Sequence, residues 1–298
     1  MKKFKFKKID AFATQKSDGN PAGMIHLDAL DDITTDEMLR IAKELKGFVS
    51  EVGYVRGIDE NTFDLKYYSS EREVDFCGHA TIAIMYDLIK NSENLINKKR
   101  INIITCKGNL IVENRISNED SVFITAPVPV FSSNEVNSES IAKALRIDLD
   151  EINNGCPISV VNAGLETLIV PIKSLNGILS ISPILDELKK FCIENLIDII
   201  TVYTDEVVDQ KNRYRTRVFA PTFGYLEDPA TGSGNCAFGY YLMKNKIWDG
   251  TFMSLEQNGS LENPNIIKLM AKDTEGAKPQ VVFGGGAIVR IDGEYILQ

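Results

Sequence analysis

Two stretches of the chain share one pattern of residues, and this shared pattern decides the fold. The first is Glu73-Val74-Asp75-Phe76-Cys77-Gly78-His79, and the second is Glu227-Asp228-Pro229-Ala230-Thr231-Gly232-Ser233. When Cys77 is aligned with Thr231, Glu73 coincides with Glu227 and Gly78 coincides with Gly232. The two stretches therefore predict an internal repeat.

The segments that flank the two stretches also correspond. Each stretch follows a strand-like run, at 63–69 in the first half and at 214–219 in the second. Each stretch leads into an apolar run with helical spacing, at 79–90 and at 232–245. We therefore expect a strand–turn–helix unit that occurs twice.

A second pair of glycine turns and one proline-rich segment complete the predicted organisation. Cys106-Lys107-Gly108-Asn109-Leu110 follows the first helix, and Gln257-Asn258-Gly259-Ser260-Leu261 follows the second. Pro127-Val128-Pro129 is the best domain boundary, because paired prolines interrupt regular structure. We predict an N-terminal domain over residues 1–127 and a C-terminal domain over residues 128–298, whose last strand can cross back to the first domain.

Length and charge exclude several classes of function. The chain has 298 residues, which suggests about two domains at roughly 150 residues each. Its 33 basic and 42 acidic side chains give a net charge of −9, which disfavours nucleic acid as a partner. No apolar run approaches the ~20 residues that cross a bilayer, and the first ten residues lack the apolar core of a signal peptide. We expect no membrane association and a cytoplasmic location.

The cysteine and histidine content disfavours a disulfide framework and a metal centre. The five cysteines are scattered, odd in number and without a Cys-x-x-Cys pair, which is typical of reduced thiols. The two histidines, His26 and His79, cannot form a histidine-rich metal site. We therefore expect no metal-ligand cluster, and acid–base chemistry that rests on carboxylates.

Each of the two repeated turns lies at the predicted N-terminus of a buried helix. The first N–H groups of a helix lack partners within it and carry a positive partial charge, and glycine lets a ligand approach them closely. Two such ends facing a shared cleft would bind a small anion such as a carboxylate. The alternative is that Gly78 and Gly232 belong to ordinary helix caps.

Four further side chains are candidates for the chemistry. Glu51 lies in Val49–Val55, a strand-like run with few other charges, where a carboxylate can act as a general base. Alternatively, it lies on the solvent face of an edge strand. Asp228 and Ser233 flank the second helix start. Cys77 is either a thiolate at a helix N-terminus or a buried structural cysteine, and the sequence favours the latter because its repeat partner is Thr231.

Five motifs of the sequence resemble the phenazine-biosynthesis PhzF family in order and spacing. They are Asp10-Ala11-Phe12, Gly19-Asn20-Pro21-Ala22, Ser50-Glu51, the extended first turn Glu73–Thr81 and the second turn Glu227–Ser233. The resemblance runs from about Ile9 to Ile296. It implies the α+β diaminopimelate-epimerase-like fold, in which two pseudo-symmetric domains each wrap a sheet or barrel around a central helix.

The resemblance also implies an activity and a set of site residues. The family's best-known activity is isomerisation of a dihydro-hydroxyanthranilate without metal or organic cofactor. The resemblance implies Glu51, His79 and Asp228 as catalytic residues. The residues implied for substrate binding are Asn20, Cys77, Gly78, Gly232 and Ser233. A homodimer is implied by the family alone.

The leading hypothesis is therefore a cofactor-independent isomerase that binds a small carboxylic acid between its two domains. The alternatives are an amino-acid racemase or epimerase that uses Glu51 and Cys77, and a non-catalytic protein that binds a small acid. Two departures from the family pattern affect the substrate. Val52 follows the glutamate where the family often has threonine, and Asn263 replaces the arginine of a later Gly-Arg-Pro-Ser segment.

Overall fold

The computed structural model describes residues 1–29, 32–274 and 277–298. The chain divides into two compact units. The first comprises Met1–Thr125 and Gly284–Gln298, and the second comprises Ala126–Phe283. Gly284–Gln298 thus cluster with the first unit, although they follow the second unit in the chain.

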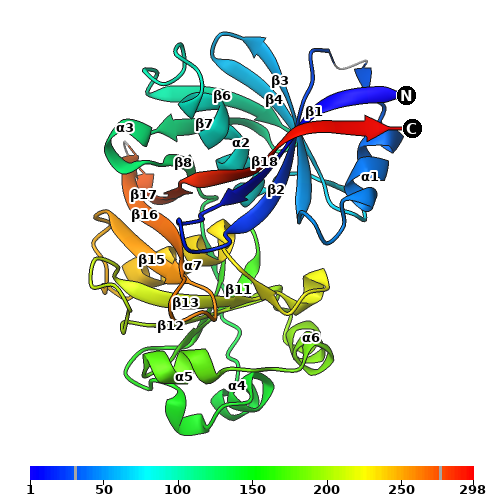
Figure 1. The fold of residues 1–298 in the computed structure, drawn as a ribbon. Helices are drawn as coiled ribbons and strands as arrows, with labels where there is room; N and C mark the ends of the chain where they lie inside the picture. Colours follow the sequence, from blue (N-terminus) through cyan, green and yellow to red (C-terminus); the bar gives the residue numbers. More distant parts are fainter. Residues whose placement is uncertain (30–31, 275–276) are drawn as a thin grey trace. The chain divides into compact units, whose positions relative to one another are not determined.

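Over its described residues, the first unit is a mixed sheet with three α-helices. Its strands are β1 (Lys2–Ala11), β2 (Asn20–His26), β3 (Glu51–Asp59), β4 (Thr62–Tyr68), β5 (Glu73–Val74), β6 (Arg100–Thr105), β7 (Gly108–Asn114), β8 (Val122–Thr125) and β18 (Ala287–Leu297). Its helices are α1 (Thr35–Glu44), α2 (Gly78–Lys90) and α3 (Ile116–Glu119). The two ends of the chain lie side by side, because β1 pairs antiparallel with β18 and Lys2 faces Leu297 (Figure 1).

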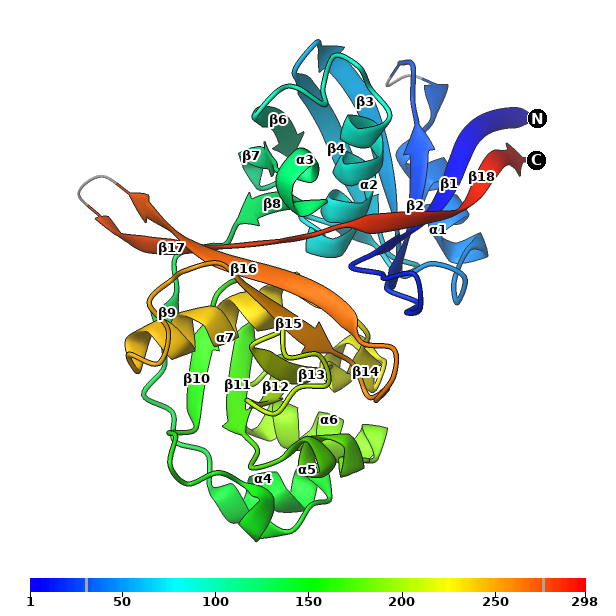
Figure 2. The same ribbon diagram turned by 60° about the vertical axis from the view of Figure 1, so that its left-hand side comes forward.

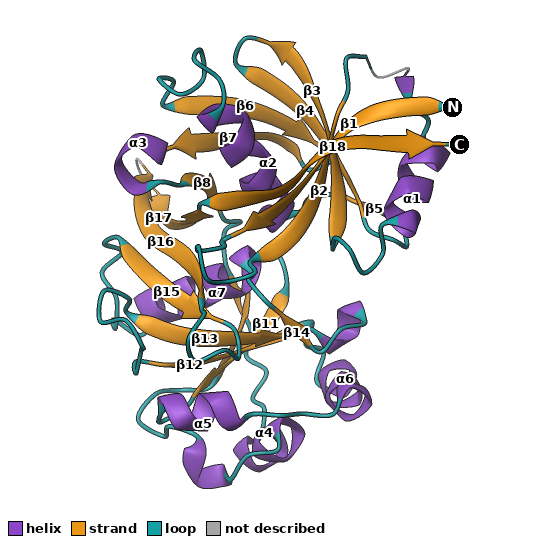
Figure 3. Cartoon of the chain, in the orientation of Figure 1, coloured by secondary structure: helices purple, strands orange, loops and turns teal. Residues whose placement is uncertain are grey.

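The second unit has the same kind of architecture. Its strands are β9 (Val130–Phe131), β10 (Ser159–Asn162), β11 (Glu166–Pro171), β12 (Ile199–Thr204), β13 (Tyr214–Phe219), β14 (Glu227–Asp228), β15 (Met253–Gln257), β16 (Asn265–Thr274) and β17 (Ala277–Gly285). Its helices are α4 (Ser138–Leu145), α5 (Leu175–Ser180), α6 (Leu185–Glu194) and α7 (Gly232–Lys244), with short 3-10 turns at Leu149–Glu151 and Pro221–Phe223. Within this unit, α7 covers one face of the strands and α4, α5 and α6 cover the other (Figure 3).

The strand pairings repeat from one unit to the other. In the first unit, β2 runs parallel to β3, β3 antiparallel to β4, β4 parallel to β6 and β6 antiparallel to β7. In the second unit, β11, β12, β13, β15 and β16 follow the same sequence of directions. The first parallel pair is joined through α1 in one unit and through α5 and α6 in the other. The second parallel pair is joined through α2 and through α7, respectively. The duplication predicted from the turns therefore extends over whole sheets.

Helix α2 lies at the centre of the first unit. It contacts β1, β2, β3, β8 and β18, and the strands surround it in both views (Figures 1 and 2). Its buried residues come from all sides of the helix: Ala80, Thr81, Ile82, Ala83, Ile84, Met85, Tyr86, Asp87 and Ile89. A helix that is apolar all round is stable only when it is enclosed, which explains this position.

Helix α7 has the corresponding position in the second unit. Ten of its residues are buried, and it contacts β10, β11, β12 and β16. Both helices begin at the glycine of their turn, Gly78 and Gly232, with Cys77 and Thr231 as extended N-cap residues. The predicted alignment of the two turns is therefore reproduced by the helix starts.

An Asp-Gly pair favours a hairpin turn and a Ser-Pro pair favours a helix start, but neither local preference decides the structure here. Asp292-Gly293 does not form a hairpin but lies inside β18, where long-range pairing with β1 places Gly293 opposite Phe6. The Ser182-Pro183 pair does not open α6, which starts at Leu185 after the N-cap Ile184. Asp186 and Glu187 in its first turn complement the helix dipole there.

All five cysteines lie in the described part of the chain and are free thiols. Among the described residues, none of the helices has both the length and the apolar character needed to cross a membrane.

Gly53 of strand β3 lies against helix α2, and a methyl group there should disrupt their packing. A Cβ at this position would lie 2.2 Å from Cδ1 of Ile84. Overpacking of this kind costs about 1–3 kcal/mol, so we expect Gly53→Ala to lower the free energy of unfolding by that amount in chemical denaturation. Gly293→Ala is the control, because no atom lies within 4 Å of its added Cβ. Equal stability of the two variants would contradict this packing argument.

Candidate active site

Three polar side chains meet at the N-terminus of α2. Glu51 is the first residue of β3, Cys77 is the N-cap of α2, and His79 is in its first turn. The Nε2 atom of His79 lies 3.2 Å from Oε2 of Glu51. The Sγ atom of Cys77 lies 3.4 Å from Nδ1 of His79 and 3.8 Å from Oε2 of Glu51. Each side chain thus contacts both of the others.

The parallel pairing of β2 and β3 holds Glu51 in place. Ala22 faces Glu51 across this pair. Just before the strand, the N–H of Ser50 donates to the carbonyl of Pro21 at 2.9 Å. The Ser50 hydroxyl donates to Oδ1 of Asn20 at 3.2 Å. Asn20, predicted to bind substrate, is buried and positions the segment that carries Glu51.

Thr81 and Tyr67 fix the start of α2. The Thr81 hydroxyl donates to the carbonyl of Cys77 at 2.7 Å, and the hydroxyls of Thr81 and Tyr67 are 2.6 Å apart. Both side chains are buried. The sequence analysis did not single out either residue, although Thr81 closes the extended first-turn motif.

Burial and mutual charge set the protonation of this group. Burial of the ring lowers the pKa of His79, but the Cys77 sulfur and the Glu51 carboxylate outweigh this effect, so the net pKa lies well above 6.5. Burial raises the pKa of the Cys77 thiol; His79 opposes this rise and Glu51 adds to it. The two directions favour a neutral thiol on Cys77 and a protonated ring on His79.

The carboxylate of this group remains open to solvent. The side chain of Glu51 is 21% exposed and that of His79 is 12% exposed, whereas Cys77 is buried. A small molecule can therefore reach Glu51 while His79 holds it from the protein side. This combination of access and fixed orientation suits a general base.

The corresponding turn of the second unit is held by Gln257. Its Nε2 donates to the carbonyl of Asp228 at 2.8 Å, and its Oε1 accepts from the N–H of Thr231 at 2.9 Å. The same Oε1 accepts from Nδ2 of Asn235 at 2.6 Å. The sequence analysis missed Gln257 as a site residue, although the repeat alignment had placed it first in its glycine turn.

Asp228, Gly232 and Ser233 therefore belong to one ordered turn. Asp228 is buried and pairs with Val218 across β13 and β14. Gly232 is required for packing, because a Cβ there would lie 2.3 Å from the ring of Phe283. Packing against Phe283 is therefore one reason for glycine at position 232. The close approach of a ligand, expected from the sequence, is a second and separate reason.

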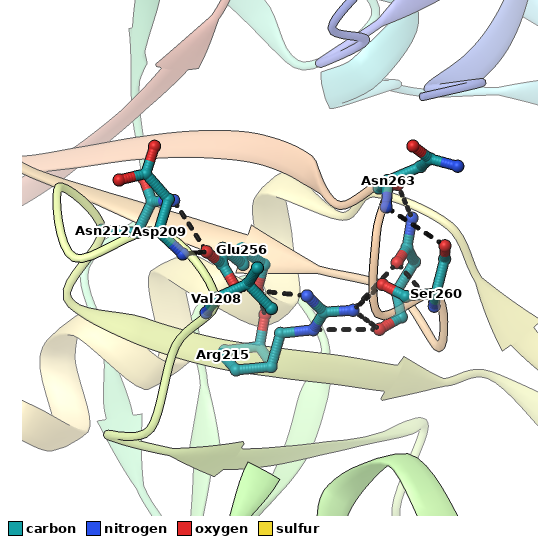
Figure 4. Close-up of polar contacts among 9 residues, drawn as sticks. Val208, Asp209, Asn212, Arg215, Glu256, Ser260 and Asn263 are labelled. Atoms are coloured by element: carbon teal, nitrogen blue, oxygen red, sulfur yellow. Dashed lines mark hydrogen bonds and ion pairs between the residues drawn. The ribbon is translucent and has the colours of Figure 1, made fainter. Parts of the chain in front are cut away.

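A buried ion pair stabilises the loop that follows Gln257. Arg215 Nη1 lies 3.1 Å from Oε2 of Glu256, and both side chains are fully buried (Figure 4). The guanidinium also donates to the carbonyls of Asn258 and Ser260. Asn258 donates in turn to the carbonyl of Asn263 at 3.0 Å. This loop contains the position where the family pattern has its arginine.

The structure brings together one set of predicted residues. It groups Glu51, Cys77 and His79, with Asn20 next to them through Ser50. Donor atoms of Glu51, Cys77 and His79 all lie within 4.8 Å of one another, a grouping that was not predicted from the sequence. The sequence did not show this because Glu51 is distant in the chain from the other two residues.

The phenazine biosynthesis-like protein family, PhzC-PhzF, matches residues 9–293. The chain belongs to this family. A protein of Clostridium acetobutylicum described as an uncharacterized isomerase is 28% identical over 100% of this chain and 99% of its own length. The trans-2,3-dihydro-3-hydroxyanthranilate isomerase of Pseudomonas fluorescens is 25% identical over 94% of this chain and 98% of its own. This PhzF-like protein is therefore an isomerase.

Solved structures show the same fold. The PhzF-family phenazine biosynthesis protein of Bacillus anthracis is 26% identical, with a TM-score of 0.88 and complete coverage of both chains. A hydroxyproline epimerase of Agrobacterium vitis has a TM-score of 0.57 at 8% identity and covers 99% of this chain and 91% of its own. The predicted diaminopimelate-epimerase-like α+β fold is confirmed.

The raised pKa of His79 should depend on Glu51. We expect Glu51→Gln to lower the pKa of His79, since the neutral amide no longer stabilises the imidazolium. Titration of the His79 ring signals by NMR measures this shift. Glu73→Gln is the control, because Glu73 contacts Tyr68 and Cys106 instead. An unchanged His79 pKa in Glu51→Gln would contradict the proposed electrostatics.

The same pKa shift has a consequence for stability. The folded state binds the His79 proton more tightly than the unfolded state does. Its contribution to stability is therefore complete below pH 6.5 and is lost as the pH rises through the pKa of the folded protein. Glu51→Gln should weaken this pH dependence.

Proposed function

We propose that this protein is a cofactor-independent isomerase that moves a proton from one carbon to another on a small carboxylic acid. The observation that carries the proposal is the Glu51 carboxylate, which is solvent-accessible and lies 3.2 Å from Nε2 of His79. A carboxylate oriented in this way can accept a proton from carbon and return it. Membership of an isomerase family supports this chemistry.

The reaction conserves protons and electrons. Glu51 removes a proton from a carbon that the substrate has acidified, and the electron pair of the broken C–H bond moves into the conjugated system of the substrate. Glu51, now a carboxylic acid, returns the same proton to a different carbon. The double bonds shift, Glu51 is again a carboxylate, and no oxidant or reductant is consumed.

His79 is proposed to orient the carboxylate of Glu51. The contact of His79 Nε2 with Oε2 of Glu51 at 3.2 Å is proposed to fix which carboxylate oxygen faces the substrate. The N–H groups of Gly78 and His79 are proposed to bind the substrate carboxylate at the positive end of α2. Asp228, Gly232 and Ser233 are proposed to orient the substrate, as the repeat suggests.

The relative from Pseudomonas fluorescens supplies a first substrate to test. Its name denotes isomerisation of trans-2,3-dihydro-3-hydroxyanthranilate, a small cyclic acid. We propose acids of this class, cyclic and partly unsaturated, as substrates of this chain. Because Asn263 replaces the arginine of the family pattern, the substituent recognised there is proposed to differ.

The distance between Cys77 and Glu51 does not favour the alternative of a racemase or epimerase that uses both residues. Their Sγ and Oε2 atoms are 3.8 Å apart. Inversion at one carbon needs the base and the acid on opposite faces of that carbon, and two groups in direct contact leave no space for it between them. Chiral analysis of the product separates epimerisation from isomerisation.

A homodimer and a cytoplasmic location, which follow from the family resemblance and the composition, stay predictions. Light scattering coupled to size-exclusion chromatography measures the oligomeric state directly.

Glu51→Gln should abolish most of the activity without unfolding the protein. The amide keeps the shape of the side chain but cannot take up a proton, and general acid–base catalysis contributes typically ~10²–10⁴-fold. We therefore expect solvent deuterium to enter the substrate at least ~100-fold more slowly. Asp228→Asn should also slow the exchange, because it impairs substrate orientation. Glu51→Gln should still unfold cooperatively on heating, with no more than the modest loss of stability that follows from removing the His79–Glu51 pair.

The matched comparison is Cys77→Ala. This change leaves the carboxylate in place, so an isomerase that uses Glu51 should lose less activity than in Glu51→Gln. Exchange at the wild-type rate in Glu51→Gln, with no exchange in Cys77→Ala, would show that the thiol is the base and would overturn the proposal.

A further inference from the structure

The Glu51–Cys77–His79 group has the donor atoms of a zinc site. It offers one carboxylate oxygen, one sulfur and one imidazole nitrogen, and these are the three kinds of protein ligand that Zn²⁺ accepts. Thiolate and imidazole donors select thiophilic cations over Mg²⁺ and Ca²⁺, which prefer oxygen ligands only. All three residues belong to the first unit and are held there by β3 and α2.

The distances between the donors fit tetrahedral coordination. Bond lengths of ~2.3 Å to sulfur and ~2.0–2.1 Å to nitrogen and oxygen require separations of roughly 3.6 Å from sulfur to either lighter atom and roughly 3.3 Å from nitrogen to oxygen. The Sγ atom of Cys77 lies 3.8 Å from Oε2 of Glu51 and 3.9 Å from Nε2 of His79. Nε2 and Oε2 are 3.2 Å apart. Adjustments of a few tenths of an ångström complete the geometry.

We propose that Glu51, Cys77 and His79 bind one thiophilic divalent cation, such as Zn²⁺, and that this cation inhibits the enzyme. Three protein ligands leave a fourth position for water, as in open zinc sites. On binding, the cation replaces the thiol proton of Cys77 and the imidazolium proton of His79, and both protons pass to solvent. The Cys77 sulfur bonds to the metal without any change of oxidation state.

Inhibition follows from the ligand set and rests on the proposed function. A cation bound to Oε2 of Glu51 occupies the carboxylate that is proposed to remove the substrate proton. His79 is bound at the same time and no longer pairs with Glu51. Metal binding itself does not depend on the identity of the substrate, so binding and inhibition can be tested separately.

The chain contains a matched control for the thiol. Cys106 donates to Oε1 of Glu73 at 3.4 Å, so it is also a cysteine beside a glutamate. The three-residue group of donor atoms, however, consists of Glu51, Cys77 and His79. Cys106→Ser therefore removes a thiol next to a carboxylate without touching the proposed site.

Binding is measured on the full chain, stripped with a chelator, by calorimetric titration with Zn²⁺ and by absorbance with Co²⁺. We expect one ion per chain and a thiolate-to-cobalt charge-transfer band. Cys77→Ser should abolish the band and weaken Zn²⁺ binding by more than ~100-fold, since loss of an outer-shell partner alone typically costs 10–100-fold. Cys106→Ser should bind like the wild type. Circular dichroism checks folding, and His79→Gln serves as the second variant if Cys77→Ser does not fold.

Each outcome bears on the proposal. Wild-type affinity in both Cys77→Ser and His79→Gln, or loss of binding in Cys106→Ser, would overturn the site. In the activity arm, Zn²⁺ should stop solvent-deuterium exchange and a chelator should restore it, whereas full exchange in the zinc-loaded enzyme would overturn the inhibition. If Glu51→Gln retains activity, the proposed function fails, while the calorimetric result still decides the metal site.

Discussion

The enclosure of α2 is the constraint on which the rest of the first unit depends. A helix with buried residues on every side requires surrounding strands, and β1, β2, β3, β8 and β18 supply them. The sides of α2 are therefore occupied by packing contacts with these strands. The polar chemistry is concentrated at its first turn, where backbone N–H groups lack partners within the helix. Glu51 reaches this turn because β3 packs against α2, where Gly53 lies against Ile84.

The two units keep one topology and have different chemistry at the corresponding turns. Cys77 and His79 in the first turn correspond to Thr231 and Ser233 in the second. The first turn forms a titratable group with Glu51, whereas the second is held by the neutral amides of Gln257 and Asn235. The buried Arg215–Glu256 pair anchors the loop after Gln257. One turn is thus suited to moving protons, and the other to a fixed arrangement of polar groups.

The local parts of this fold could be predicted from the sequence, because they depend on nearby residues. The strand–turn–helix repeat and the Thr34–Glu37 capping box of α1 are local patterns, and both are present. The contact of Glu51 with Cys77 and His79 is a tertiary contact that spacing does not reveal. Gln257 was not predicted as a site residue for the same reason, since its contacts with Asp228 and Thr231 are tertiary. Asp292-Gly293 does not form a hairpin, because pairing with β1 outweighs the local turn preference.

The central claim is that Glu51 and His79 act as one unit, and a double-mutant cycle tests it most directly. Solvent-deuterium exchange into the substrate is measured for the wild type, Glu51→Gln, His79→Gln and the double variant. Residues that act together show strongly non-additive effects, so the account predicts that the double variant is about as slow as Glu51→Gln alone. A double variant whose loss equals the product of the two single losses would contradict the account.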